Sequence, residues 1–235
     1  TPFSNDRVRY VTYNNELGNI YSYSVVGIRP VVNLKNDIKI IDGDGTEENP
    51  YRLEGDNDTN LSGTLLNTRY SGEYIKFGTG DNLLYRIVSH EEEGLTKIVS
   101  ATPLISGNDF LYMAYDNNSS VNYSTNTTIG DFLNNTYLNT YLLTDAQEMI
   151  ADNTTWYFGT IARGINYKLA KYADTDMSSK VDKQAVAKVG LLRIGELMAG
   201  QEIVEEIGLP YLTIDYWVLN PYSLGTVRYV DSSSY

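Results

Sequence analysis

The chain has 235 residues, of which 42% are hydrophobic and 20% are charged, so it is long and apolar enough for one large domain or two small ones. Its 18 Lys and Arg residues against 30 Asp and Glu give a net charge of −12, which disfavours nucleic acid and anionic membranes as partners. With no cysteine and one histidine, His90, the chain lacks the residues for disulfides, thiolate or two-histidine metal sites, and we expect no enzymatic activity.

The first elements in chain order are predicted to be strands. Residues Val8 to Thr12 and Ile20 to Val26 have strand-like patterns on either side of a turn at 14–19, and residues 27–34 with 38–41 continue in extended form. Pro30 has no N–H to donate to a sheet, so we expect an edge or a bulge there.

The next stretch, from Asp42 to Asp58, is the most polar and turn-rich part of the chain. We therefore place a boundary here, between residues 1–54 and residues 57–235. Asp42, Asp44 and Glu47 resemble the first half of a calcium loop, but the downstream Gly and bidentate Glu are missing. A calcium site and an acidic surface turn both stay open, and no other cofactor is expected.

Three strands are predicted beyond the boundary, at residues 74–77, 83–89 and 96–102. The last two form a hairpin across residues 90–94, and we expect His90 to be solvated at its tip.

Helices are predicted in the second half of the chain. Apolar residues recur at a helical spacing over residues 129–141. Thr144 and Gln147 resemble a capping box that starts a second short helix. The segment 186–198 is expected to begin extended and end as a helical turn, and residues 211–230 are strand-like. The sequence thus predicts an α+β fold in which strands dominate.

The two ends of the chain carry a repeat. Residues 220–230, NPYSLGTVRYV, align without a gap on residues 1–11, TPFSNDRVRYV, with identical Pro, Ser, Val, Arg, Tyr and Val. The offset is 220 − 1 = 219 residues, so the chain is about one period long and runs slightly past its own start. The alternative is two unrelated turns that each lead into a tyrosine-containing strand.

Four segments together resemble a known family. They are GIRPVVNL at 27–34, GDGTEENPY at 43–51, GLLRIGELM at 190–198 and YWVLNPYS at 216–223. They resemble a repeat domain of Gram-positive bacterial surface and pilin-like proteins, which is similar to the C-type-lectin-like fold of formylglycine-generating-enzyme relatives. The resemblance implies a strand-rich, C-type-lectin-like body with a few short helices. It implies no oxidase activity, because the enzymes of that fold need active-site cysteines.

The order of these segments departs from the family, in which the Trp segment comes first and GIRPVVNL closes the domain. The resemblance therefore implies that residues 1–54 complete one domain and that residues 57–235 form a body that lacks its terminal strands. A body of this kind exposes a sheet edge, which either its own N-terminal strands or those of a neighbour must cover.

Because the chain carries two copies of the VRYV strand, we favour donation between subunits in a head-to-tail polymer, or an excerpt from a tandem array of such repeats. A head-to-tail contact that does not close forms a filament. The donor residues would be Val8, Tyr10, Ile28, Val31, Val32 and Leu34.

Two functions are therefore expected. The first is a structural subunit of an extracellular fibre or surface appendage that assembles with copies of itself. The second is a lectin-like adhesin module that binds a surface glycan or a protein through loops such as 108–126. Candidate ligand contacts are Tyr216, Trp217 and Tyr222, for which packing in the core is the alternative.

The expected location is extracellular. The composition of 21 tyrosines and 19 glycines is typical of strand-rich surface proteins, and no apolar run approaches the roughly 18 residues that span a membrane. The chain begins at Thr1 without a start Met or a signal sequence, so we expect a soluble, processed segment.

Overall fold

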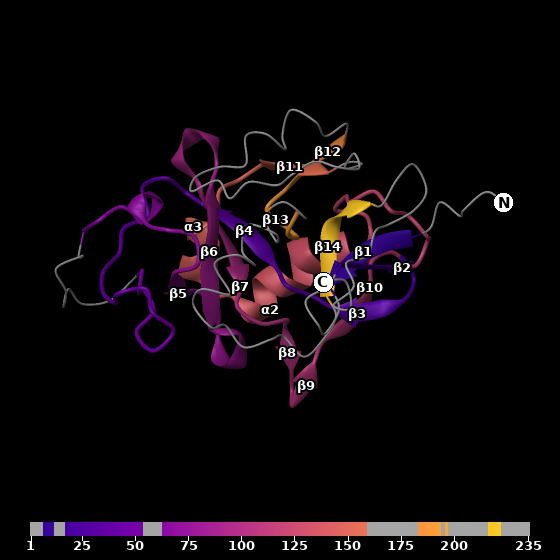
Figure 1. The fold of residues 1–235 in the computed structure, drawn as a ribbon, viewed down its shortest axis with the longest axis horizontal. Helices are drawn as coiled ribbons and strands as arrows, with labels where there is room; N and C mark the ends of the chain where they lie inside the picture. The colour runs from indigo at the N-terminus through magenta and orange to yellow at the C-terminus, as the bar shows by residue number, and fades with distance from the viewer. Residues whose placement is uncertain are drawn as a thin grey trace, which may run out of the picture.

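The computed structural model describes residues 7–11, 17–53, 63–158, 183–193, 196 and 216–221. Two five-stranded sheets form its frame, accompanied by two two-stranded ribbons and a run of short helices (Figure 1). The strand-rich character predicted from the sequence is confirmed. Within the described residues, no helix is long and apolar enough to cross a membrane.

The first sheet brings the two ends of the chain together, and Figure 1 shows the yellow β14 beside the indigo β1. Its strand order is β10-β3-β14-β1-β2. The strands are β10 (Tyr112–Ala114), β3 (Val25–Gly27), β14 (Tyr216–Pro221), β1 (Arg7–Val11) and β2 (Leu17–Tyr21). Only the β3–β14 pair is parallel.

The second sheet is antiparallel and has the order β13-β4-β7-β6-β5. Its strands are β13 (Val189–Gly190), β4 (Val31–Leu34), β7 (Thr96–Ser100), β6 (Leu84–His90) and β5 (Tyr74–Lys76). The predicted hairpin of β6 and β7 is confirmed, with the short 3₁₀ turn η3 (Glu92–Gly94) at its tip.

The smaller elements lie around these sheets. The ribbons are β8 (Ile105–Ser106) with β9 (Asp109–Phe110), and β11 (Thr154–Phe158) with β12 (Lys183–Ala187). Two further 3₁₀ turns are η1 (Leu66–Thr68) and η2 (Gly80–Asn82).

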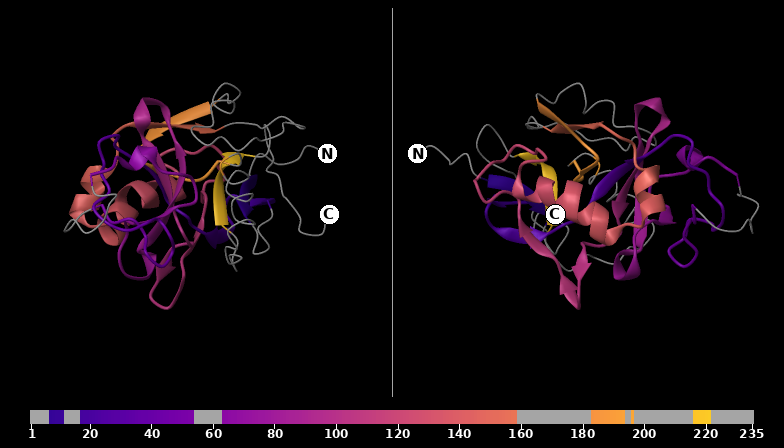
Figure 2. Two further views of the ribbon diagram at one scale, coloured as in Figure 1. Left: turned by 60° about the vertical axis from the view of Figure 1, so that its left-hand side comes forward. Right: turned by 180° about the vertical axis from the view of Figure 1, so that it is seen from behind.

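The helix predicted over residues 129–141 is confirmed as one helical run. It consists of α1 (Thr128–Asp131), a π-helical segment η4 (Phe132–Tyr137) and α2 (Leu138–Tyr141), and it is seen from behind in Figure 2. The Thr127 hydroxyl caps it by accepting a hydrogen bond from the Gly130 N–H at 3.2 Å. The next helix, α3 (Thr144–Met149), forms as predicted, but the capping box is wrong because its N-cap is Leu143 and no side chain caps it.

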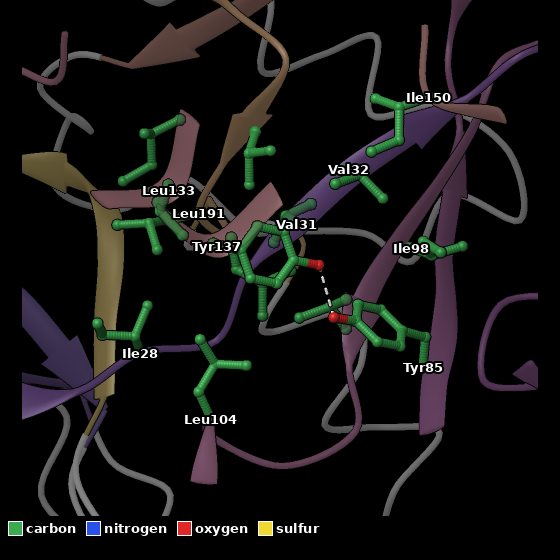
Figure 3. Close-up of a cluster of buried hydrophobic side chains, with 14 of the residues drawn as sticks. Ile28, Val31, Val32, Tyr85, Ile98, Leu104, Leu133, Tyr137, Ile150 and Leu191 are labelled. Atoms are coloured by element: carbon green, nitrogen blue, oxygen red, sulfur yellow. Dashed lines mark hydrogen bonds between the residues drawn. The ribbon is translucent and has the colours of Figure 1, made fainter. Parts of the chain in front are cut away.

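The main core lies between the helical run and the second sheet (Figure 3). Tyr137 of η4 and Tyr85 of β6 are both fully buried, and their hydroxyls form a hydrogen bond of 2.6 Å. Figure 3 shows Val32 of β4 and Ile98 of β7 on the same side of the sheet as this pair. Buried tyrosines with paired hydroxyls explain part of the high tyrosine content.

Two local predictions need correction. The strand expected over Ile20 to Val26 is two strands, because the Ser24 N–H bonds to the Tyr21 carbonyl at 2.9 Å and turns the chain between β2 and β3. The prediction that His90 is solvated at the hairpin tip is also wrong. This residue is 5% exposed, with Nε2 2.5 Å from the Arg69 carbonyl and Nδ1 3.2 Å from the Thr96 hydroxyl.

Pro30 lies between β3 and β4, so it removes no donor from either strand. Its carbonyl accepts a hydrogen bond from the Ser100 N–H at 3.1 Å, and the strand that follows is central rather than an edge.

Candidate functional site: the joint between the N-terminal segment and the body

The N-terminal segment, residues 7–53, supplies an interior strand to each sheet formed with the body, residues 63–221. In the second sheet, β4 pairs with β7 from Val31↔Val99 to Leu34↔Thr96, and with β13 on its other side. In the first sheet, β3 lies between β10 and β14. We call this contact region the joint.

The predicted donor residues of β4 and its approach lie in the core of this joint. Ile28, Val31, Val32 and Leu34 have no exposed surface. At about 1.5–3 kcal/mol for each buried aliphatic side chain, the four contribute roughly 6–12 kcal/mol, which is as large as the net stability of a typical domain. Val8 and Tyr10 belong to β1, whose backbone pairs with β14 and β2. The body therefore depends on these strands.

In this structure of one chain, the N-terminal segment pairs with the body of the same chain. This is the closed arrangement, and donation to a neighbour stays a prediction. Backbone hydrogen bonds also tie residues 35–53 to residues beyond the predicted boundary, including Ile40 N–H to Thr64 O at 2.9 Å and Tyr51 N–H to Tyr74 O at 2.8 Å.

Arg29 joins the N-terminal segment to two parts of the body, the end of β7 and the start of β14, by hydrogen bonds. Its Nη2 donates to the Ser100 and Ala101 carbonyls at 2.8 and 3.1 Å, and its Nη1 donates to the Tyr216 hydroxyl at 3.1 Å. The guanidinium carbon also lies 4.8 Å from the centre of the Tyr216 ring. Burial raises the pKa of Tyr216 and Arg29 opposes the rise, so the hydroxyl stays protonated at neutral pH.

A buried ionic cluster lies beside β4, because Lys97 of β7 is directly opposite Asn33. Lys97 Nζ is 2.6 Å from Oε1 of both Glu91 and Glu196, and Arg193 Nε is 3.0 Å from Glu196 Oε1. Lys97 and Glu196 are each 4% exposed. Burial alone would raise the pKa of Glu196, but Lys97 and Arg193 outweigh it and hold the pKa at about 2.

Trp156 covers the same region of the second sheet. Lys97 Nζ lies 5.4 Å from the centre of its ring, and its indole N–H donates to the Ala187 carbonyl at 2.9 Å. The ring packs so closely on Gly190 that a Cβ there would lie 2.5 Å from it, so this position of β13 requires glycine.

The three carboxylates proposed for calcium have separate partners. Asp42 forms an ion pair with Arg52, and Asp44 accepts hydrogen bonds from the Thr46 hydroxyl at 2.8 Å and the Thr46 N–H at 3.1 Å. The hydrogen bond from the Thr46 hydroxyl lowers the pKa of Asp44. Burial raises the pKa of Tyr74, and the negative charge of Glu47 raises it further. Among the described residues, no three His, Cys, Asp or Glu side chains are grouped to hold a metal ion.

The GDGTEENPY motif is a structural loop in this chain. Gly43 has a φ of 90°, and a Cβ there would lie 2.3 Å from the Pro50 carbonyl oxygen. The loop places Tyr51 in the core, where its hydroxyl accepts a hydrogen bond from Arg69 Nε at 2.8 Å.

The aromatic residues proposed for ligand binding lie inside the protein. Tyr216 is 1% exposed and Trp217 is 0% exposed. The Trp217 indole N–H donates to the Met113 carbonyl at 2.7 Å, and its ring meets Tyr115 edge to face at 5.6 Å. These two residues therefore offer no exposed face to a sugar. Tyr222 lies outside the described residues.

The sequence analysis missed the charged residues of the joint. Arg29, Lys97, Arg193 and Glu196 each stand inside an otherwise apolar run, in GIRPVV, LTKIVS and GLLRIGEL. A charge within a run that reads as a buried element must find a partner, and this signal identifies all four.

Comparison with protein-family models, with curated proteins and with solved structures found no match. The family resemblance of the sequence, and the C-type-lectin-like fold that it implies, stay predictions.

Proposed function

We propose that the protein is a structural subunit of an extracellular fibre or surface appendage, in which the N-terminal strands of one copy complete the C-type-lectin-like body of the next. One observation carries the proposal: β3 and β4 lie between body strands, and Ile28, which lies between β3 and β4, and Val31, Val32 and Leu34 of β4 are completely buried. A segment this deeply built into the body is required in every copy, whether its own chain or a neighbour supplies it.

The charged contacts of the joint support the same proposal. Arg29 of the segment reaches the body through carbonyls and the Tyr216 hydroxyl, whereas the Lys97 cluster lies wholly within the body, with Lys97 opposite Asn33 of β4. The Arg29 contacts work equally well when the N-terminal segment belongs to another copy, because they join the segment to the body rather than to itself, and the cluster needs no side chain of the segment. Residues 54–62 are the connection that decides which body the segment reaches.

Light scattering and electron microscopy of the unmodified chain test the proposal. We expect assemblies whose mass grows with protein concentration, and filaments with an axial repeat of one subunit. Removing residues 56–60 shortens the connection, which disfavours closure on the same chain and should shift the equilibrium toward assemblies. The matched control replaces the same five residues with Gly and Ser at unchanged length. A compact monomer at every concentration for both variants would exclude strand donation.

A second candidate, the adhesin module, is favoured by exposed tyrosines. Tyr21 and Tyr23 stack at 5.0 Å with Tyr23 48% exposed, and Tyr112 of β10, which lies within residues 108–126, is 47% exposed. Exposed tyrosine rings provide faces for sugars. Glycan-array binding that is lost in the Tyr23→Ser and Tyr112→Ser variants but kept in the Tyr70→Ser variant, which removes a ring of similar exposure (47%), would support this function.

A further inference from the structure

The sequence of the strand between β14 and β2 occurs twice in this chain. In the structure β1, residues 7–11, occupies that position, with Val8 opposite Pro221 and Tyr10 opposite Trp217. Residues 227–230 repeat the sequence Val-Arg-Tyr-Val of residues 8–11 without a change. Two segments of the sequence therefore match the single strand position between β14 and β2.

Both flanking strands can reach this position by a short hairpin. β1 is antiparallel to β2, and Val11 opposite Leu17 leaves five residues, 12–16, as the connecting loop. β1 is also antiparallel to β14. If Val227 takes the place of Val8 opposite Pro221, five residues, 222–226, are left as the loop. Hairpin loops of about two to five residues are the common range, so the direction, the register and the loop length all suit the second copy.

We infer that the position between β14 and β2 is an exchange site, in which residues 227–230 replace β1. The two occupants form the same sheet hydrogen bonds through the same four residues, so the backbone pairing alone gives neither a large advantage. The exchange releases β1, residues 7–11, from the sheet.

This inference rests on the proposed function where it concerns assembly, because the released strand is then the part of the chain that can pair with a second copy. It gives the repeated Val-Arg-Tyr-Val sequence a role in a protein that donates strands. A copy whose position is filled by its own C-terminal strand keeps a complete first sheet while its N-terminal strand is free to be donated.

Engineered disulfides can identify the occupant, because the natural chain contains no cysteine. Arg9 lies opposite Asn19 in the β1–β2 pair, and Arg228 is the repeat equivalent of Arg9. Opposed residues in antiparallel strands have Cα atoms about 4.5–5.5 Å apart, which suits a disulfide. The full-length Asn19→Cys, Arg9→Cys and Asn19→Cys, Arg228→Cys variants are oxidised and their disulfides are mapped by mass spectrometry. The Asn19→Cys, Ser233→Cys variant, outside the repeat, measures random collision.

We expect the Arg228→Cys pair to crosslink at least ten times faster than the Ser233→Cys pair. A crosslink within one chain shows exchange in that chain, and a crosslink between chains shows that the strand comes from a second copy. Either result supports the exchange site. Crosslinking of the Arg228→Cys pair at only the control rate, while the Arg9→Cys pair goes to completion, would overturn it. Because the proposed function is tested by light scattering on the unmodified chain, either idea can fail while the other stands.

Discussion

The N-terminal segment enters the two sheets in different ways. In the second sheet, β4 is a central strand whose four residues are all buried, and its sequence GIRPVVNL occurs once in the chain. In the first sheet, β1 pairs with β14 through a register that shifts between Val8 and Tyr10, and its sequence occurs twice. The two strands belong to the same segment, but the sequence of β1 recurs in the chain and that of β4 does not.

We therefore expect the loss of β4 to destabilise the fold, and the loss of β1 to be compensated by exchange. The four residues of β4 are buried, and its Asn33 lies opposite Lys97, so the removal of β4 uncovers core residues and the strand that carries Lys97. β1 can leave without uncovering a vacancy if residues 227–230 take its place. The comparison can be tested by damaging each strand and its surroundings separately.

The largest effect is expected for Val32→Asp in β4. The substitution places a carboxylate at a position with no exposed surface, and we expect it to destabilise the chain by more than about 4 kcal/mol and to abolish the cooperative transition in urea. Val186→Asp in β12, where the side chain is 56% exposed, is the matched control and should change stability by less than about 0.5 kcal/mol. A normal transition for Val32→Asp would contradict the structure of the second sheet.

The ionic cluster beside β4 is expected to give the next largest effect. Glu196→Gln leaves Arg193 and Lys97 buried with one carboxylate fewer, and breaking a buried pair in this way costs about 3–5 kcal/mol. The matched control is Asp152→Asn at the exposed pair with Lys188, which should leave the midpoint of urea unfolding unchanged. Equal midpoints for the two variants would show that the buried cluster does not stabilise the folded chain.

The same cluster predicts a dependence on pH. The pKa of Glu196 is lowered from 4.5 to about 2 in the folded protein, so its stabilisation is complete above pH 4.5 and is lost as the pH falls toward 2. The loss is on the order of 3 kcal/mol. Urea unfolding at pH 7, pH 4.5 and pH 2 should show a steeper acid loss for the natural chain than for Glu196→Gln. Parallel curves for the two proteins would mean that Glu196 titrates normally.

Much of the local structure could be predicted from the sequence because it depends on near neighbours. The hairpin of β6 and β7 follows from two apolar runs around a Gly-containing turn, and the helical run from Thr128 to Tyr141 follows from its apolar spacing. His90 could not be predicted in this way. Its burial depends on the Arg69 carbonyl, which lies 21 residues away in sequence.

The contacts of the joint could not be predicted either, because their partners are even farther away in sequence. The pattern of GIRPVVNL indicated an extended segment, and the family resemblance implied that it completes a body, but the partners of Arg29 are 71 and 187 residues away. Trp217 was proposed as a ligand contact because aromatic residues occur both in cores and on surfaces, and its partners in the core, the Met113 carbonyl and the Tyr115 ring, are more than 100 residues away in sequence. Pattern gives the character of a segment, whereas its partners come from the tertiary structure.

The smallest single effect, and the most informative one, is expected in β1. Proline at the centre of a sheet strand removes a backbone donor, so Tyr10→Pro should expel β1, but we expect it to cost at most about 1 kcal/mol because residues 227–230 take its place. Tyr229→Pro alone should cost as little, since β1 is then kept. The double variant has no intact strand for the position and should lose about 3 kcal/mol or more, well beyond the sum of the single effects. Val32→Pro in β4 is the contrast, because a strand without a duplicate should lose about 3 kcal/mol or more from one substitution. If the losses in free energy of unfolding for Tyr10→Pro and Tyr229→Pro simply add in the double variant, the two copies do not occupy the same position and the chain does not exchange one for the other.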